Sequence, residues 1–450
     1  MATTTDRSVA PGAPYSALFG AALAQLPGSR HAGIRRLRQA SFDRFMTLGF
    51  PGPKTEAWKY TSIGRLARAE FELAPAVDLT RAAIAPYLVA GARHLVFVNG
   101  HFSADLSDTE SDVGSVNDRA TVKTLARALE EGDPAVVAAL PESDPERAFS
   151  ALNDAFVTDG CVIRLDDGAS LAHPIQLLFV ATVEQDHPRL INPRNVVIVG
   201  DGARLDLIES HVMLDGAQSL TNLVNQVVVG KGAALRHDRL QIGAGEGTVI
   251  GKTHYDISAD ARLTQTLATL GGALVRNEIR AAIQGSGVEA AFNGMYFTCE
   301  RQHVDNNILV DHAAPGSTSD QFYKGILDGR SQAVFAGKIV VRREAQKTNA
   351  YQANNNLLLS SEAEIDTKPE LEIFADDVKC SHGATAGELD ERELFYLRSR
   401  GLDPVTARNL LTFAFAGAVL ERFTSSAIAE QAKVALLRGL PGGAALEELT

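Results

Sequence analysis

The sequence predicts a mainly β protein in which a parallel β-helix lies between two helical regions. Three observations support this fold class. Helical spacing of apolar residues is nearly absent between residues 160 and 380. A turn of Gly, Asp or Ser recurs there at long intervals, and alternating strand-like residues follow each turn. Helical spacing is present before residue 155 and returns after residue 387.

Length, charge and cysteine content limit the class of protein. The chain has 450 residues, which predicts two or three domains, and a formal net charge of −12. Because an acidic chain gains nothing by releasing the counterions of DNA or RNA, we expect neither nucleic acid nor an anionic membrane as partner. No apolar run reaches the ~18 residues of a membrane helix, and the N-terminus lacks a secretory signal. The cysteines are too few and too far apart for a disulfide framework, so we expect a reducing cytoplasm for Cys161, Cys299 and Cys380.

Residues 1–155 are predicted to form a tail and a mainly helical domain. Small and polar residues dominate 1–13, which we interpret as a disordered tail. Apolar residues recur every three or four positions over 15–49, as in helices, and this spacing returns over 121–140 and 144–157. Asn99-Gly100 separates two apolar runs and predicts a hairpin with a two-residue turn. The N-terminal domain is therefore placed at 14–155.

Residues 156–387 are predicted to form the β-helix. The turn motif begins at residues 200 (GDGARLDL), 230 (GKGAALRH), 258 (SADARLTQ), 285 (GSGVEAAF), 328 (DGRSQAVF) and 360 (SSEAEIDT). The intervals between these starts are 30, 28, 27, 43 and 32 residues. Because one coil cannot bury its apolar face alone, repeats of this kind stack into a solenoid. A β-sandwich is the alternative, with turns expected about every 8–12 residues.

Residues 388–450 are predicted to form a C-terminal helical domain. ELDERELFYLRSRGL and DPVTARNLLTFAFAGAVLERF have helical spacing and meet near Gly401, and SSAIAEQAKVALLRGL adds a third helix. Asp403 is a suitable N-cap, and Pro404 a suitable first residue, for the second helix. We expect the first two helices to form a hairpin that packs on the end of the solenoid or on another protein.

Two further segments are assigned structural roles. Gly251-Lys252-Thr253 is similar to part of a phosphate-binding loop, but Glu246 stands where that loop needs glycine, and the following residues alternate as a strand. Nucleotide binding is therefore not predicted. The segment 299–312 contains metal-capable residue types at a spacing that matches no compact zinc pattern. We expect structural positions for its polar residues and for the cysteine of DGCVIRL, namely Cys299, His303, Asp305, Asp311, His312 and Cys161.

The segment DDVKCSHGATAGELD places Cys380 and His382 two residues apart. LEIFADDVKC alternates as a strand, so both side chains are expected on one face, with Cα atoms ~6.6–7 Å apart. A break over 375–377 is the alternative, and the placement of the pair on one face would survive it. A thiolate and an imidazole so placed can bind one metal ion, with two more ligands from Asp376, Asp377 or a partner subunit. A Cys–His nucleophile pair is a second interpretation, although no orienting group or oxyanion hole is identified. A structural position in a core is the third.

The residues around this pair carry a resemblance to a known family. NNNLLLSSEAEIDTKPELEIFADDVKCSHGATAGELDERELFYLRSRG (354–401) resembles the signature of the SufB/SufD family of iron–sulfur cluster assembly proteins, with KPELEI (368–373) and CSHGA (380–384) intact. Weaker similarity extends over most of the chain, including LVFVNGHFS, SALNDAFVTDG and VDNNILVDH. The CSHG form and the LFYLRSRG ending are similar to the SufD branch rather than to its paralogue SufB.

The resemblance implies a right-handed parallel β-helix and a complex of SufB, SufD and the ATPase SufC. In such a complex SufC binds the C-terminal helices and hydrolyses ATP, which makes this chain a non-catalytic scaffold subunit. His382, and less directly Cys380, is implied to face SufB across a heterodimer interface as a ligand of iron or of a transient iron–sulfur cluster. A reduced flavin associates with complexes of this family, and no residue here places it.

The residues just after the pair have the character of an interface anchor. Aromatic and arginine side chains are enriched among the residues that dominate binding energy, and this group comprises Phe395, Tyr396, Arg398 and Arg400. Packing of the two aromatic rings against the end of the β-helix is the alternative.

We therefore predict a SufD-like scaffold subunit of a SufBCD-type complex in the cytoplasm. The expected partners are a SufB-like paralogue and a SufC-like ATPase, with a homodimer when the chain is alone. Two alternatives stay open, a structural solenoid adaptor without metal chemistry and a β-helix carbohydrate-active enzyme. The second should carry clustered carboxylates and aromatic platforms, which the repeat region lacks.

Overall fold

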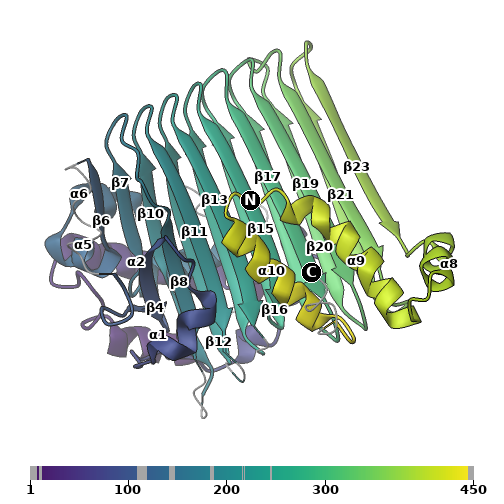
Figure 1. Cartoon of the computed structure of the whole chain (residues 1–450). Coiled ribbons are helices and arrows are strands. Elements are labelled where there is room, and N and C mark those ends of the chain that lie inside the picture. The colour runs from purple at the N-terminus through teal and green to yellow at the C-terminus, as the bar shows by residue number, and fades with distance from the viewer. Residues whose placement is uncertain are drawn as a thin grey trace.

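The computed structural model describes residues 8–9, 13–108, 119–140, 147–182, 187–214, 216, 218–243 and 246–443. In this part of the chain, two long sheets face each other and form a β-helix of about seven turns (Figure 1). Neighbouring strands within each sheet belong to successive coils and are parallel, for example β12 with β14 and β13 with β15. The prediction of a parallel β-helix is therefore confirmed, and the antiparallel sandwich is excluded.

The first sheet, called sheet 1 below, contains nine strands along its main path. In spatial order they are β6 (Ala120–Thr124), β7 (Cys161–Leu165), β10 (Arg194–Val199), β12 (Ser219–Val229), β14 (Thr248–Ile257), β16 (Leu274–Ile283), β18 (His303–His312), β20 (Gln332–Val341) and β22 (Glu364–Ile373). Two short strands lie beside this path, β3 (Glu72–Leu73) on β9 (Arg189–Ile191) and β9 on β12.

The second sheet, called sheet 2 below, contains strands that alternate with those of sheet 1 along the chain from β10 onward. In spatial order they are β5 (His101–Phe102), β4 (Arg93–Val98), β8 (Ile175–Ala181), β11 (Arg204–Met213), β13 (Ala234–Gly243), β15 (Arg262–Gly271), β17 (Glu289–Thr298), β19 (Thr318–Leu327), β21 (Asn349–Leu358) and β23 (Lys379–Gly387). Alternate residues of each strand point into the space between the sheets, where Val275, Ile279, Phe292 and Phe335 are buried.

The recurring turns lie at two different corners of the coil. The turns that begin at 200, 230, 258 and 285 join a strand of sheet 1 to one of sheet 2, whereas those at 328 and 360 join sheet 2 to sheet 1. The predicted interval of 43 residues therefore spans one and a half coils and is not a longer repeat. Strand pairing gives the true period, because Leu220 pairs with Thr248, 28 residues on, and Thr248 with Leu274, 26 residues on.

The third residue of each turn at the first corner explains the recurring motif. Its backbone lies in the left-handed region, with φ of 66° at Gly202, 63° at Gly232, 59° at Asp260 and 71° at Gly287. Glycine adopts this conformation without steric cost, and aspartate tolerates it better than most residues. The motif is thus a backbone requirement of the corner, and it carries no chemistry.

The N-terminal region covers the outer face of sheet 1 at its first coils. Aromatic side chains of α1 (Ala13–Ala22), α2 (Ala32–Leu48) and α7 (Ala148–Phe156) cluster there with Leu220 and Ile250 of the sheet. The remaining short elements of this region are β2 (Phe50–Pro51), η1 (Glu56–Trp58), η2 (Leu66–Arg68), α3 (Arg81–Ile84), η3 (Ala85–Tyr87), α5 (Leu125–Glu131) and α6 (Pro134–Ala139).

The sheets begin earlier in the chain than residue 156. Strands β4 and β6 lie within the predicted helical domain 14–155 but extend sheet 2 and sheet 1. The predicted hairpin is confirmed, because β4 pairs antiparallel with β5 through a turn in which φ is 51° at Asn99 and 79° at Gly100. Most of the predicted tail, 1–7 and 10–12, lies outside the described residues, whereas β1 (Ser8–Val9) pairs with β2.

The C-terminal helices are α8 (Glu391–Ser399), α9 (Pro404–Leu420) and α10 (Ser426–Gly439), as the spacing predicts. Asp403 caps α9 by accepting hydrogen bonds from the N–H groups of Val405 (3.0 Å) and Thr406 (3.1 Å). Helices α9 and α10 lie across the outer face of sheet 2, whereas α8 stands apart beyond the end of β23 (Figure 1). Of the two helices predicted to form a hairpin across Gly401, α8 contacts α9, and α9 packs on the outer face of sheet 2 rather than on the end of the solenoid. Within the described residues, no helix is both long and apolar enough to cross a bilayer.

Asp238 attaches α10 to the solenoid and should make stability depend on pH. From the outer face of β13 its carboxylate accepts hydrogen bonds from the N–H groups of Thr424 (3.2 Å) and Ser425 (2.6 Å), next to the start of α10. Burial raises the pKa of Asp238 to about 6. Because the unfolded chain releases this proton at lower pH, the contribution of Asp238, roughly 3 kcal/mol, is present below pH 4 and lost as the pH rises through 6.

We expect the variant Asp238→Asn to lose this part of the pH dependence. Urea unfolding of both proteins at several pH values between 4 and 7 measures it as the difference between their free energies of unfolding. Taking the difference removes contributions common to both proteins, including that of Asp159, whose pKa burial also raises to about 6. Equal slopes for the two proteins would show that the Asp238 carboxylate titrates normally.

Candidate metal and partner site at the open end of the β-helix

The two ends of the β-helix differ in how the sheet edges are covered. At the N-terminal end, β4 is joined by antiparallel β5, and β7 by antiparallel β6. At the other end, β22 pairs with β20 and β23 with β21, and no further strand among the described residues pairs with either. Two strands of ten and nine residues therefore present open edges (Figure 1). Long open edges are templates for pairing with another chain.

The direction of the backbone groups at the edge of β23 follows from one hydrogen bond. The N–H of Lys379 donates to the carbonyl of Thr348. In a parallel ladder such bonds involve every second residue, so the N–H groups of Cys380, His382, Ala384 and Ala386 face the open edge. On β22, the N–H of Glu364 bonds inward to β20, which places Pro369 at an open-edge position. Proline lacks an N–H and is tolerated there because no ladder bond is lost.

Cys380 and His382 both lie on the inner face of β23, at the mouth of the solenoid. They pair in register with Ala350 and Gln352, which point into the core of the previous coil. The strand expected over 371–380 is interrupted, as in the predicted alternative of a break over 375–377, because β22 ends at Ile373 and a turn over 374–378 separates it from β23. The placement of the pair on one face survives this break, because both residues follow it.

The thiol and the imidazole have different surroundings. Cys380 is partly buried and packs against a small apolar cluster that includes Val341 and Ala350. This burial raises the pKa of the Cys380 thiol, so the protonated form is favoured and the residue is not an activated nucleophile. His382 is exposed at the open end.

The described residues do not bring a complete set of metal ligands together at this end. Within the described residues, no group of three or more His, Cys, Asp and Glu side chains converges to hold a metal ion. Asp376 and Asp377 are exposed in the turn and do not complete such a group with Cys380 and His382. A site completed by a partner subunit stays a prediction.

Polar side chains of β21 hold β23 in place. The Nδ2 of Asn356 donates to the carbonyl of Thr385 (3.1 Å), and the Thr385 hydroxyl donates to Asn355 Oδ1 (2.9 Å). Asn354, Asn356 and Gln352 are buried on the inner face of β21. A strand read by alternation alone would have an apolar inner face here, so these positions were missed.

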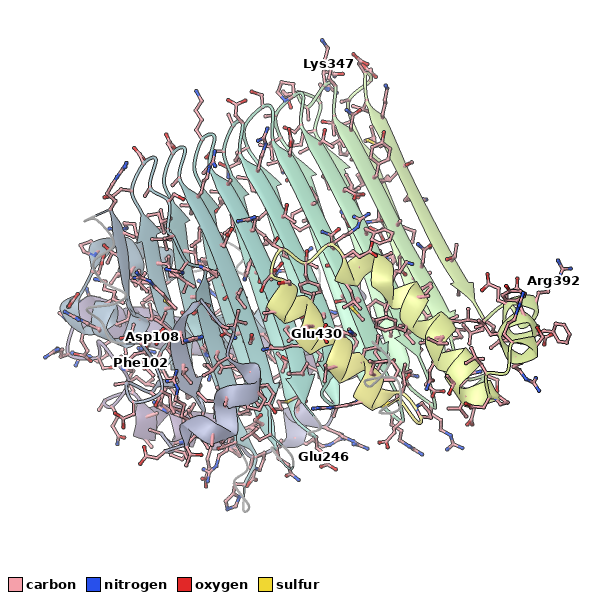
Figure 2. All side chains as sticks on the ribbon, in the orientation of Figure 1. Phe102, Asp108, Glu246, Lys347, Arg392 and Glu430 are labelled. Carbon is pink, nitrogen blue, oxygen red and sulfur yellow. The ribbon has the colours of Figure 1, made fainter. Side chains whose placement is uncertain are left out.

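Helix α8 carries the predicted anchor residues on an open surface. Phe395 is 73% exposed and Tyr396 57% exposed, so their packing against the end of the β-helix, the alternative from the sequence, is wrong within this chain. The Arg400 guanidinium lies 5.3 Å from the centre of the Tyr396 ring, and Arg398 is exposed in the last turn. Figure 2 shows Arg392 on α8 and Lys347 at opposite ends of the last coils.

The family comparisons agree with this architecture. The SufBD core domain of the SUF system for FeS cluster assembly matches residues 179–415, and the SufBD protein N-terminal region matches residues 11–177. The chain belongs to the SufBD family. Its family core holds most of the β-helix and the Cys380–His382 pair, and the two family regions meet at residues 177–179.

Relatives within the SufBD family match over nearly their full length. A SufBD family iron–sulfur cluster assembly protein of Synechocystis is 33% identical over 409 residues, 89% of this chain and 89% of the relative. The iron–sulfur cluster assembly protein SufD of Escherichia coli is 30% identical over 423 residues, 92% of this chain and 95% of the relative. The chloroplastic protein ABCI7 of Arabidopsis thaliana is 29% identical over 446 residues, 96% and 93%. The chain is thus an iron–sulfur cluster assembly protein of the SufBD family, similar to SufD.

The other metal-capable residues occupy structural positions in this SufBD chain. His303 contacts the Thr61 hydroxyl (3.0 Å), and His312 contacts that of Ser319 (2.8 Å). The carboxylate of Asp311 binds Arg342 at 2.5 Å. Lys252 lies in the interior of strand β14, as the rejection of a phosphate loop predicts. Cys161 is fully buried in β7, and burial raises its pKa.

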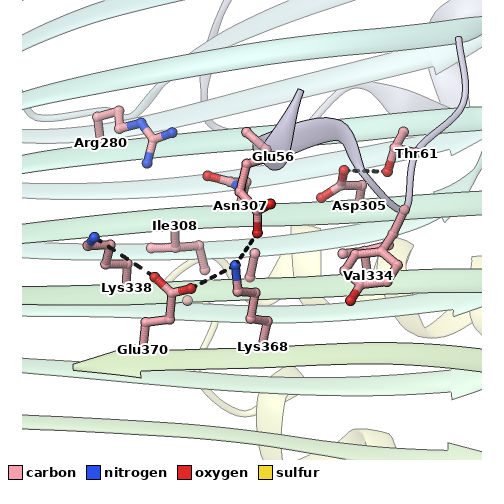
Figure 3. Close-up of a pocket in the computed structure, with 14 residues that line it drawn as sticks. Glu56, Thr61, Arg280, Asp305, Asn307, Ile308, Val334, Lys338, Lys368 and Glu370 are labelled. Carbon is pink, nitrogen blue, oxygen red and sulfur yellow. Dashed lines mark hydrogen bonds and ion pairs between the residues drawn. The ribbon is translucent and has the colours of Figure 1, made fainter. Parts of the chain in front are cut away.

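The N-terminal region reaches the last coil on the outer face of sheet 1. Thr61 donates to Asp305 (2.5 Å), and Lys368 of β22 binds both Glu56 (2.7 Å) and Glu370 (2.8 Å) (Figure 3). A cavity of about 240 Å³ lies between this segment and the sheet. Its lysine charges face neighbouring carboxylates, so the contacts serve to hold β22 rather than to attract an anion.

Proposed function

We propose that this chain is a SufD-like scaffold subunit of a SufBCD-type complex, and that a SufB-like paralogue completes the site at its open end. The observation that carries the proposal is the position of Cys380 and His382, which lie on the inner face of an edge strand that no described strand covers. Two ligand-type side chains at the boundary of the subunit favour a site shared with a second protein.

Pairing of open edges provides the physical basis for the partner. Unpaired N–H groups along nine residues of β23 gain hydrogen bonds when a strand of another subunit lies beside them. Ile373 (41% exposed) and Phe374 (61% exposed) add apolar surface in the same last coil. A paralogue with an equivalent open end satisfies both needs, and a homodimer does so when the paralogue is absent.

Iron, or a nascent iron–sulfur cluster, is the cargo that we assign to the shared site. Thiolate and imidazole are both established ligands of iron in such clusters. Because the raised pKa of Cys380 favours the thiol, binding through this sulfur must release a proton, which weakens the hold of the site. Small rotations between subunits separate ligands that belong to different chains, and such a site suits transfer better than storage.

We assign the binding surface for the ATPase partner to helix α8. In this proposal a SufC-like chain hydrolyses ATP and docks on the exposed rings of Phe395 and Tyr396, while this chain remains a non-catalytic scaffold.

The three cysteines are unpaired, as expected of a protein that works in a reducing compartment such as the cytoplasm.

Anaerobic co-purification with the paralogue and the ATPase tests the proposal. We expect the double variant Ile373→Asp/Phe374→Asp to bind the paralogue at least about tenfold more weakly, because burying a carboxylate in an apolar contact is costly. Iron and acid-labile sulfide bound to the complex should fall in parallel. Val228→Asp is a matched control, since Val228 is an exposed apolar residue (40%) in the middle of sheet 1. Unchanged paralogue binding by the double variant would place the interface elsewhere.

A further inference from the structure

A row of three polar residues crosses the last coils of sheet 2 and ends at His382. Gln321 of β19 pairs in register with Gln352 of β21, and Gln352 pairs with His382 of β23. All three lie on the inner face of the sheet, because residues in register on neighbouring strands share a face. Adjacent strands are about 4.8 Å apart, so Gln352 and His382 are neighbouring residues on the last two strands of sheet 2.

In the side-chain amide of Gln352, the nitrogen has a hydrogen-bond partner and the oxygen has none among the described residues. Its Nε2 donates a hydrogen bond to Gln321 Oε1 (2.7 Å), which turns Oε1 away from Gln321. Gln352 is only 3% exposed, and its Oε1 accepts no hydrogen bond from any residue that the structure describes. A buried acceptor without a donor is costly, and such groups are rare in folded proteins.

The opposite sheet has a space shaped for this side chain. Gly337 of β20 faces Gln352 across the core, and a Cβ on Gly337 would overlap the Nε2 of Gln352. The same Cβ would also crowd the Phe335 ring at 2.9 Å. Gln352 is therefore held by a glycine niche on one side and by Gln321 on another, while its free oxygen remains beside the strand that carries His382.

We propose that Gln352 is a positioning residue for His382, and that in the assembled complex the His382 ring N–H donates to Gln352 Oε1, a hydrogen bond that the described part of the single chain does not show. This hydrogen bond fixes the tautomer and the orientation of the imidazole, so that the other ring nitrogen is presented at the open end to iron. The inference rests on the proposed function for the identity of the bound metal, whereas the contact itself does not. Partners of this kind commonly set which nitrogen of a metal-binding histidine is free.

Nuclear magnetic resonance tests the contact without any cluster. The chain is labelled with ¹⁵N-histidine and measured in the anaerobic complex with its paralogue before cluster loading, with the His382 signals assigned by their loss in His382→Ala. We expect one dominant His382 tautomer in the wild type. In Gln352→Leu the ratio of the tautomers should change at least about twofold, because the leucine side chain has no acceptor. An unchanged ratio would overturn the proposal.

Cluster assembly tests the consequence of the contact. We expect Gln352→Leu to form the complex normally but to hold roughly tenfold less cluster, as loss of an outer-shell partner does at other metal sites. Gln352→Glu keeps an acceptor oxygen and should recover most of the yield. Gln265→Leu is the matched control, a buried glutamine in the same row three coils away, and should behave as wild type.

The outcomes separate this inference from the proposed function. An equal loss in Gln265→Leu, or a normal cluster yield in Gln352→Leu, would overturn the positioning role. Normal cluster assembly in His382→Ala would overturn the proposed function, whereas the tautomer measurement would still decide whether Gln352 and His382 are in contact.

Discussion

Replacing His382 with alanine is expected to leave the chain folded and the complex assembled while lowering cluster assembly at least about tenfold. Loss of a residue that only hydrogen-bonds to a metal ligand commonly lowers metal affinity or activity 10–100-fold. Loss of the ligand itself should lower cluster assembly by no less. His382 is exposed on an edge strand, and the described part of the chain shows no hydrogen bond from its ring, so removing the ring should not affect folding. Iron and acid-labile sulfide in the anaerobically purified complex, normalised to protein, measure the effect.

A second histidine variant makes this experiment specific. His254 lies on the outer face of β14, contacts Asp256 (3.3 Å) and is far in the chain from the open end. His254→Ala should assemble clusters at the wild-type level. A normal yield in His382→Ala would reject a ligand role, and a structural adaptor without metal chemistry would then be the better description. A low yield in both variants would point to a general loss of folding.

Replacing Phe395 and Tyr396 together with aspartate is expected to reduce binding of the ATPase at least about a hundredfold. Buried aromatic anchors often contribute 2 kcal/mol or more each to binding, and about 1.4 kcal/mol corresponds to a tenfold change in affinity. Both rings are mostly exposed on α8 and pack on no core of this chain, so the substitutions should not destabilise the fold. Pull-down of the ATPase over a concentration series measures the change.

Point variants are a better test of this interface than deletion of the whole C-terminal region. Helices α9 and α10 bury apolar residues such as Val419 and Ile428 against Val212 and Leu240 of sheet 2. A chain cut after Gly387 would expose this surface and could lose the ATPase merely by misfolding. Tyr60→Asp is the matched control, because Tyr60 is an exposed ring (41%) on the opposite side of the solenoid. Undiminished binding by the α8 variant would show that the ATPase binds another surface of this chain.

The sequence predicted the type of each long element well, and its errors have identifiable causes. Turn motifs were found at the right residues because a left-handed backbone position selects Gly or Asp locally. The sequence did not distinguish the turns that lead from sheet 1 to sheet 2 from those that lead back, because the two corners of a coil use similar residues. That is why the starts at 285 and 328 were read as consecutive. Strand β6 was missed because it is short and lies directly before helical spacing. Strand β4 was predicted as part of a hairpin, but its place in sheet 2 follows only from pairing with β8.

The site was predicted in part for the same reasons. Residues that are two positions apart on a strand point to the same face, whatever that strand packs against. The placement of Cys380 and His382 on one face therefore followed from local geometry. Gln352 lies thirty residues earlier in the chain and becomes a neighbour of His382 only through strand pairing between coils. Glycine at position 337 is explained only by the side chain opposite it.

By itself, the sequence determined the fold class, the helix limits near Asp403, the family and the two ligand-type side chains, because each depends on local backbone preference or on a contiguous motif. The tertiary structure alone decided that these side chains lie at an uncovered end, that α8 is free while α9 and α10 are packed, and that Gln352 stands beside His382. These are properties of which coils come last and which faces are covered, and they arise only when distant segments stack.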